Sequence, residues 1–269
     1  MSISLDIIKK LREKTGAGMV DCKKSLEESN GDIDKAIETL RKKGIAKAQK
    51  RGDRDTSEGV IKVGINDENN KACILQLNSE TDFVAKNSQF QDFAEEVLNL
   101  MKNENFNSLD ELLSFQFRNS TVKEELENLS GVIGEKLEIK KIDTLEGKSL
   151  AAYSHMGGKI GVLIALNKDG ENELSSNLAM QVAAVNPKYL NSSDVPQEEI
   201  DKEKEIEREK LKKENKPEQI IDKILDGKIR KYCEEVCLVE QDYIKDDKKK
   251  IKEILGDAEI VKFIRYSLS

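Results

Sequence analysis

The chain has 269 residues, of which 36% are charged, 37% are hydrophobic and only 4% are aromatic, with no tryptophan. A net charge of −7 argues against a general nucleic-acid binder, and no apolar run approaches the roughly 20 residues that a membrane span needs. Residues 1–14 read as a charged amphipathic helix rather than a signal peptide, and the four cysteines form no CxxC pair. We therefore expect a helix-rich, cytoplasmic protein with free thiols, long enough for two domains or one elaborate domain.

Three short helices are predicted in the first 45 residues. Apolar residues recur at helical spacing from Leu5 to Leu11, and a second helix is expected over Met19–Ser29. Gly31 suits the left-handed position that ends this helix, and Asp32 suits the N-cap of a third. This pattern predicts a small bundle of the ubiquitin-associated type. Because such a bundle is marginally stable alone, we expect it to serve as a docking module.

Residues Arg41 to Arg54 are strongly basic, with seven lysines and arginines against one acid, Asp53. Like charges spaced in this way usually form a solvated segment, so a tether between the bundle and the rest of the chain is the favoured interpretation. The alternative is an electrostatic guide toward an acidic partner or toward RNA.

The next part of the chain predicts an α+β unit. Two alternating segments joined by a turn-rich loop indicate a β-hairpin, and helices and a further strand follow. The expected strands are Gly59–Ile65, Lys71–Asn78 and a strand around Leu137–Ile142, and the expected helices are Ser88–Asn103 and two more near Ser108–Phe115 and Thr121–Ile133.

The loop between the second strand and the first of these helices contains Phe83 and Val84, between Asp82 and Lys86. An aromatic residue at a loop tip either packs back on its own core or inserts into a partner. Loop statistics alone favour packing of the Phe83 ring under the following helix.

A second unit repeats this scheme. Strands are expected at Leu150–Met156 and Lys159–Asn167 across Gly157-Gly158, followed by a loop, Lys168–Asn172, and a helix. The second strand of each unit ends similarly, in Ile74-Leu75-Gln76-Leu77-Asn78 and Leu163-Ile164-Ala165-Leu166-Asn167. Only the first unit has an aromatic residue in the loop that follows, which favours a functional role for Phe83.

The C-terminal third predicts a projecting helical hairpin. Residues 197–216 are almost entirely charged, and Pro217 opens an Ile-rich helix that we expect to end at Gly227. Lys228–Leu238 is expected to return to the body of the protein. A short helix at Lys248–Leu255 and a final strand at Ile260–Ser267 complete the prediction.

The sequence offers little for catalysis. Its one histidine, His155, cannot complete a histidine-rich metal site, and no cysteine lies in a motif that supports a Cys–His pair. Phosphate-binding motifs of the GxxxxGK[ST] and GxGxxG types are absent. We expect no enzyme activity, no metal and no cofactor. We expect instead a protein that acts by binding to another protein.

Two segments resemble the signatures of the elongation factor Ts family. Leu11-Arg12-Glu13-Lys14-Thr15-Gly16-Ala17-Gly18-Met19-Val20-Asp21-Cys22-Lys23 is similar to its N-terminal signature, and Thr81-Asp82-Phe83-Val84-Ala85-Lys86-Asn87 to its second. Further similarities are Ile133-Gly134-Glu135, Tyr153–Ile164 and Phe263-Ile264-Arg265-Tyr266. The resemblance runs in order along essentially the whole chain. Well-known members carry a further C-terminal helical module, and we expect contacts made by that module to be absent here or to be replaced by another surface.

The resemblance implies a guanine nucleotide exchange factor for elongation factor Tu, a translational GTPase, and a partner in both its GDP-bound and nucleotide-free forms. It implies that Asp82 and Phe83 wedge beside the nucleotide site and help to displace Mg²⁺. No membrane and no direct nucleic-acid contact are expected. By matching motifs, the residues implied in partner binding are Thr81, Asp82, Phe83, Val84, Val20, Lys23, Ile133, Gly134 and His155.

The implied architecture is α+β: a ubiquitin-associated-like bundle, a two-subdomain core with antiparallel sheets, and an inserted coiled-coil hairpin through which the chain would form a homodimer. The expected divisions are residues 1–54 for the bundle and basic linker, 55–145 for the first subdomain, 146–189 with 228–269 for the second, and 190–227 for the hairpin. Two other functions stay open: a passive protein-binding adaptor, and a ribosome-associated RNA-binding factor that uses Arg41–Arg54.

Overall fold

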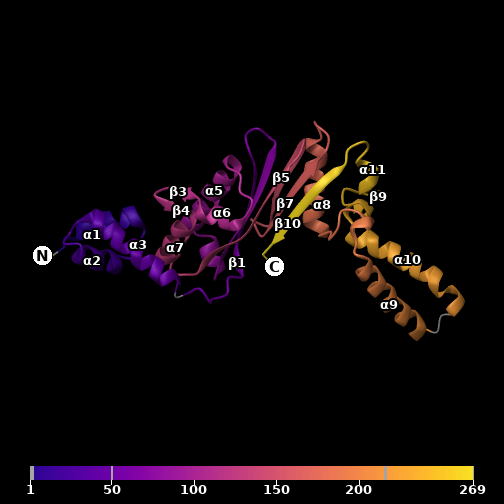
Figure 1. Ribbon diagram of the computed structural model, residues 1–269, viewed down its shortest axis with the longest axis horizontal. Coiled ribbons are helices and arrows are strands. Elements are labelled where there is room, and N and C mark those ends of the chain that lie inside the picture. Colours follow the sequence, from indigo (N-terminus) through magenta and orange to yellow (C-terminus); the bar gives the residue numbers. More distant parts are fainter. Residues whose placement is uncertain (1–2, 50, 215–216, 269) are drawn as a thin grey trace.

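The computed structural model describes residues 3–49, 51–214 and 217–268. It is an elongated α+β molecule with a helical bundle at one end, two antiparallel sheets in the middle and a helical hairpin at the other end (Figure 1). The helices are α1 (Leu5–Thr15), α2 (Met19–Glu28), α3 (Ile33–Gln49), α4 (Asp82–Ala85), α5 (Ser88–Asn103), α6 (Leu109–Ser114), α7 (Val122–Ile133), α8 (Asn172–Val185), α9 (Gln197–Lys213), α10 (Glu218–Val236) and α11 (Ile251–Ile254). The strands are β1 (Glu58–Ile65), β2 (Lys71–Ser79), β3 (Gln116–Phe117), β4 (Ser120–Thr121), β5 (Leu137–Glu146), β6 (Ser149–His155), β7 (Ile160–Leu166), β8 (Asp242–Tyr243), β9 (Asp246–Lys250) and β10 (Ile260–Ser267).

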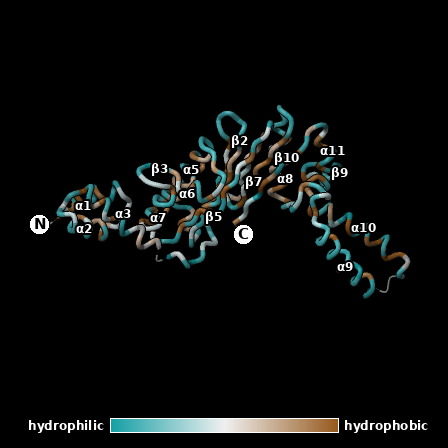
Figure 2. Tube along the Cα trace, in the orientation of Figure 1, coloured by the Kyte–Doolittle hydropathy of each residue, from teal (hydrophilic) through white to brown (hydrophobic). Residues whose placement is uncertain are grey.

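Two three-stranded antiparallel sheets, ordered β1-β2-β5 and β10-β7-β6, form the centre of the core. Side chains alternate between the two faces of a strand, and both central strands are apolar on both faces. Ile74 of β2 and Leu163 of β7 belong to the cluster between the sheets, whereas Leu75 packs toward α5 and Ile164 toward α8. Hydrophobic residues accordingly gather along these strands and the helices that cover them (Figure 2).

Three helices form at the N-terminal end as predicted, with Asn30 and Gly31 in left-handed conformations and Asp32 accepting hydrogen bonds from the N–H groups of Asp34 and Lys35. Leu11, Cys22 and Leu26 are fully buried in its core. Leu5, expected on the apolar stripe, is 63% exposed, because the face of α1 that packs on the bundle passes through Ile8 and Leu11.

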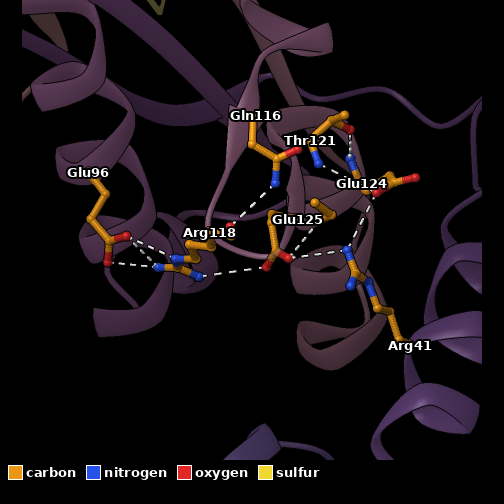
Figure 3. A network of polar contacts seen from close by, with 8 residues as sticks. Arg41, Glu96, Gln116, Arg118, Thr121, Glu124 and Glu125 are labelled. Atoms are coloured by element: carbon orange, nitrogen blue, oxygen red, sulfur yellow. Dashed lines mark hydrogen bonds and ion pairs between the residues drawn. The ribbon is translucent and has the colours of Figure 1, made fainter. Parts of the chain in front are cut away.

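The prediction of a solvated basic tether is wrong for most of its length. α3 continues to Gln49 and packs along α7, where a Cβ added to Gly131 would lie 2.4 Å from the Cα of Gly44. The Arg41 guanidinium contacts Glu124 and Glu125 of α7, at 3.4 and 3.3 Å. Glu125 also lies 3.8 Å from Arg118, which pairs with Glu96 of α5 (Figure 3). This packing stabilises the helix past the expected boundary. Lys50 lies outside the described residues.

The helical hairpin also differs from its predicted boundaries. α10 continues through Gly227 to Val236, because the helix packs against α9 on both sides of this glycine. Lys228 pairs with Glu207 of α9, and the hydroxyls of Tyr189 and Tyr232 both donate to Glu199 at the base of the hairpin. The hydrogen bond from Tyr189, followed by that from Tyr232, lowers the pKa of Glu199 to about 2. A single helical glycine costs only about 1 kcal/mol, which such packing outweighs.

The region after the hairpin departs from prediction in one place. The helix expected at Lys248–Leu255 is divided into the strand β9 and the shorter helix α11. The final strand begins and ends where predicted, and β10 pairs with β7 in a register that places Ile264 opposite Leu163. Among the described helices, none is both long and apolar enough to cross a membrane.

Candidate functional site

Phe83 lies on the first turn of α4 and points into solvent, with 81% of the residue's surface exposed. Its neighbours Val84 and Ala85 are buried in the cluster that includes Phe90 of α5. Successive helical residues differ by about 100° in direction, so burial of these two neighbours turns the Phe83 ring outward. The ring therefore does not pack under α5. Val84 has only 9% of its surface exposed, so its side chain anchors the loop instead of forming the surface contact predicted from the sequence.

Thr81 fixes the start of α4. Its hydroxyl accepts a hydrogen bond from the N–H of Val84, as an N-cap does, and donates to the carboxylate of Glu135 at 2.7 Å. The backbone N–H of Thr81 donates to the same carboxylate at 3.0 Å. Glu135 lies directly beyond Ile133 and Gly134, so these bonds join the Phe83 loop to the C-terminal end of α7.

Ile133 and Gly134 end α7 beside this loop. Gly134 has φ +95°, a left-handed conformation that favours glycine, and its N–H donates to the carbonyl of Ser130. A Cβ at this position would meet no atom within 4 Å, which leaves the backbone of Gly134 open to a partner. Ile133 is partly buried against the core.

The Asp82 carboxylate is paired with Lys86, one helical turn away, at 2.7 Å. The hydrogen bond from Lys86, with smaller contributions from the charges of Lys86 and Lys159, lowers the pKa of Asp82. Asp82 is therefore ionised at neutral pH, and its charge lies beside the exposed Phe83 ring. A partner group that competes for this carboxylate would have to displace Lys86.

His155 is the last residue of β6, and the turn that follows it toward β7 is adjacent to this loop through β1. The Gly158 carbonyl of this turn accepts a hydrogen bond from Ile61 N–H of β1 at 2.7 Å. The His155 ring is exposed, stacks on Tyr153 and lies 3.1 Å from its hydroxyl through Nδ1. Met156, which sequence reasoning missed, is also exposed on this turn. The one sequence signal for a surface role of Met156 was its position directly after His155, the single histidine of the chain.

Val20 and Lys23 lie apart from these residues, on α2 in the bundle at the N-terminal end of the molecule (Figure 1). Val20 is 67% exposed, and Lys23 pairs with Glu27 on the same helix at 3.8 Å. The structure thus groups Thr81, Phe83 and Gly134, places His155 at the end of the neighbouring strand β6, and assigns α2 to a separate surface. In the part of the chain that the structure describes, no three His, Cys, Asp or Glu side chains are grouped as metal ligands would be.

The profile of the family described as "Elongation factor TS" matches residues 80–269. A protein from a Nitratiruptor species described as "Elongation factor Ts" is 45% identical, over 100% of this chain and 93% of its own length. Another from Clostridium perfringens, with the same description, is 41% identical over 98% of this chain and 92% of its own. These matches show that the chain belongs to the elongation factor Ts family of translation elongation factors.

Proposed function

We propose that this protein is the guanine nucleotide exchange factor for elongation factor Tu and acts without enzymatic chemistry of its own. The observation that carries the proposal is the exposed ring of Phe83, held on a short helix whose first residues are hydrogen-bonded to Glu135, next to the open backbone of Gly134. An aromatic side chain exposed to this degree gains free energy only when a partner buries it. The family to which the chain belongs supplies the partner, elongation factor Tu.

The proposed mechanism is differential binding. Mg²⁺ bridges protein oxygens and nucleotide phosphates in GTPases, so its displacement weakens GDP binding. We propose that Phe83 and Asp82 enter beside the nucleotide and Mg²⁺ site when elongation factor Tu opens. Burial of one phenylalanine side chain contributes about 1.5–3 kcal/mol. Because coupling between two ligands is reciprocal, a factor that binds the nucleotide-free form more tightly must weaken GDP by the same ratio.

The remaining partner contacts are proposed on two surfaces. Ile133, Gly134 and His155 would extend the wedge surface, while Val20 and Lys23 on α2 would form a second contact away from it. Two contacts on one rigid molecule bind more tightly than either alone when both can be engaged together. The bundle would thus contribute affinity, and the core would act on the nucleotide.

The experiment that tests the proposal measures release of fluorescently labelled GDP from elongation factor Tu with and without the chain. Acceleration of release supports an exchange factor. A passive adaptor would bind elongation factor Tu and leave the release rate at its spontaneous value. An RNA-binding factor has less support, because Arg41, Arg51 and Arg54 are engaged in intramolecular contacts.

The α9–α10 hairpin is the proposed dimerisation surface. Ile206 and Ile220 are exposed large hydrophobic residues on a largely hydrophilic projection (Figure 2). Replacing residues 204–228 by a short turn removes these residues and keeps the Glu199–Tyr232 contact at the base. If the hairpin pairs two copies as a coiled coil, sedimentation equilibrium should give a dimer for the full chain and a monomer for the shortened chain. The same oligomer in both, or a monomeric full chain, would contradict this proposal.

A further inference from the structure

The segment that links α3 to β1 contacts the base of the Phe83 loop. The Arg54 guanidinium pairs with the Glu80 carboxylate at 3.1 Å, and Arg51 donates to the carbonyl of Ser130 at 3.1 Å. The Lys136 ammonium donates to the carbonyls of Gly52 and Arg54, at 2.7 and 2.9 Å. The segment from Arg51 to Arg54 is therefore attached to the residues on either side of the wedge, although 26 or more residues separate it from them in sequence.

The two segments beneath Phe83 also hold each other. The Glu80 carboxylate accepts the backbone N–H of Lys136 at 2.6 Å, while the Glu135 carboxylate accepts the backbone N–H of Thr81. Each segment thus provides a carboxylate for the backbone of the other. We call this pair of contacts the Glu80–Glu135 clamp. Its geometry allows neither Thr81 nor Lys136 to shift without breaking a hydrogen bond to a charged group.

Electrostatics favour the closed clamp at neutral pH. Burial opposes ionisation of Glu80, but the hydrogen bond from Lys136 N–H and the contact with Arg54 outweigh it and lower the pKa of this carboxyl. Hydrogen bonds to ionised groups are stronger than those between neutral groups. On the other side, the Ser130 hydroxyl donates to the carbonyl of Glu135 at 2.5 Å, which fixes the residue that carries the second carboxylate.

We propose that the Glu80–Glu135 clamp, supported by the contacts of Arg54 and Lys136, positions Phe83 for nucleotide exchange. Glu135 and Arg54 are then positioning residues. This inference rests on the proposed function. It gives the basic segment after α3 a role different from a tether or an RNA contact. Val84 and Ala85 anchor one side of the short helix α4, whereas the clamp fixes the residue where α4 begins. Displacement of a functional group by about 1 Å can cost about 100-fold in rate.

The test is a double-mutant cycle with Phe83. Glu135→Ala is expected to lower the maximal rate of GDP release by about 10-fold with little change in the chain concentration at half-saturation. Glu135→Gln, which can still accept the N–H of Thr81, should recover most of the rate. Because Glu135 acts through Phe83, adding Glu135→Ala to Phe83→Ala should slow release no further. Equal losses in both backgrounds would show that Glu135 acts independently of Phe83 and would overturn the proposal.

Two exposed basic residues provide a matched comparison. Arg54→Ala should slow release about 3-fold, whereas Lys42→Ala, at an exposed position on α3, should leave it unchanged. If both variants slow GDP release equally, and more strongly at low salt, the segment acts through its overall charge and the proposal fails.

The clamp can also be measured without elongation factor Tu. Glu135→Ala should raise the rate of amide hydrogen exchange at Thr81, while the melting temperature stays within a few degrees. An unchanged rate of hydrogen exchange at Thr81 would refute the clamp itself. If the unmodified chain failed to accelerate GDP release from elongation factor Tu, only the proposed function would be refuted.

Discussion

Replacing Phe83 with alanine is expected to slow GDP release from elongation factor Tu by about 10- to 100-fold, the equivalent of burying one phenylalanine in the complex. The same change should alter the free energy of unfolding by less than about 0.5 kcal/mol, because the ring is 81% exposed and makes little contact with its own core. Stopped-flow measurement of GDP release and thermal unfolding of the same samples check both parts.

Val84→Ala is the matched control for this prediction. Val84 is adjacent to Phe83 and buried, so its truncation leaves a cavity and should cost about 1–3 kcal/mol of stability. The rate of GDP release from elongation factor Tu, corrected for the fraction of folded variant, should fall much less than it does for Phe83→Ala. The wedge would be contradicted if a stable Phe83→Ala variant accelerated GDP release from elongation factor Tu as much as the unmodified chain does. It would also be contradicted if the variant were strongly destabilised but its folded molecules accelerated release normally.

Gly131→Ala is expected to separate the N-terminal bundle from the core. A Cβ at Gly131 would lie 2.4 Å from the Cα and 2.9 Å from the carbonyl carbon of Gly44, so backbone must move. Overpacking of this kind costs about 1–3 kcal/mol, more than the gain of up to about 1 kcal/mol in helix propensity. Small-angle scattering should show a larger radius of gyration, and the affinity for elongation factor Tu should fall because Val20 and Lys23 lose their fixed position.

Gly44→Ala on the facing helix provides the comparison. The nearest atoms to a Cβ at Gly44 lie 3.5 Å or more away, which is ordinary contact, so this change should leave the scattering profile unchanged and stabilise α3 slightly. Equal expansion by both variants would mean that the close approach at Gly131 does not hold the bundle. An unchanged profile for Gly131→Ala would contradict the rigid joint between α3 and α7.

Much of the core could be predicted because its signals are local. The apolar runs of β2 and β7 indicate strands, and the helical periodicity of residues 88–103 predicts α5 with the bounds that the structure has. The exposure of Phe83 could be argued from the second half of the chain, whose equivalent loop has no aromatic residue, and from the resemblance of residues 81–87 to a family signature.

The features that sequence reasoning missed depend on residues far apart in the chain. α3 continues past Leu40 because Gly44 meets Gly131, and α10 continues past Gly227 because Lys228 reaches Glu207. Nothing local to either helix signals such a partner. The same holds for the Glu80–Glu135 clamp, where the Thr81 N–H and its acceptor are separated by 54 positions. Local patterns locate elements, whereas the contacts that align the site are set by the tertiary fold.

The release of labelled GDP from elongation factor Tu tests the central claim most directly when the chain is present at about one-tenth the concentration of the GTPase, with unlabelled nucleotide in excess. An exchange factor acts repeatedly, so all of the labelled GDP should leave in a single phase at least about 10-fold faster than the spontaneous rate. Release at the spontaneous rate would contradict the account, as would a fast phase limited to one-tenth of the label.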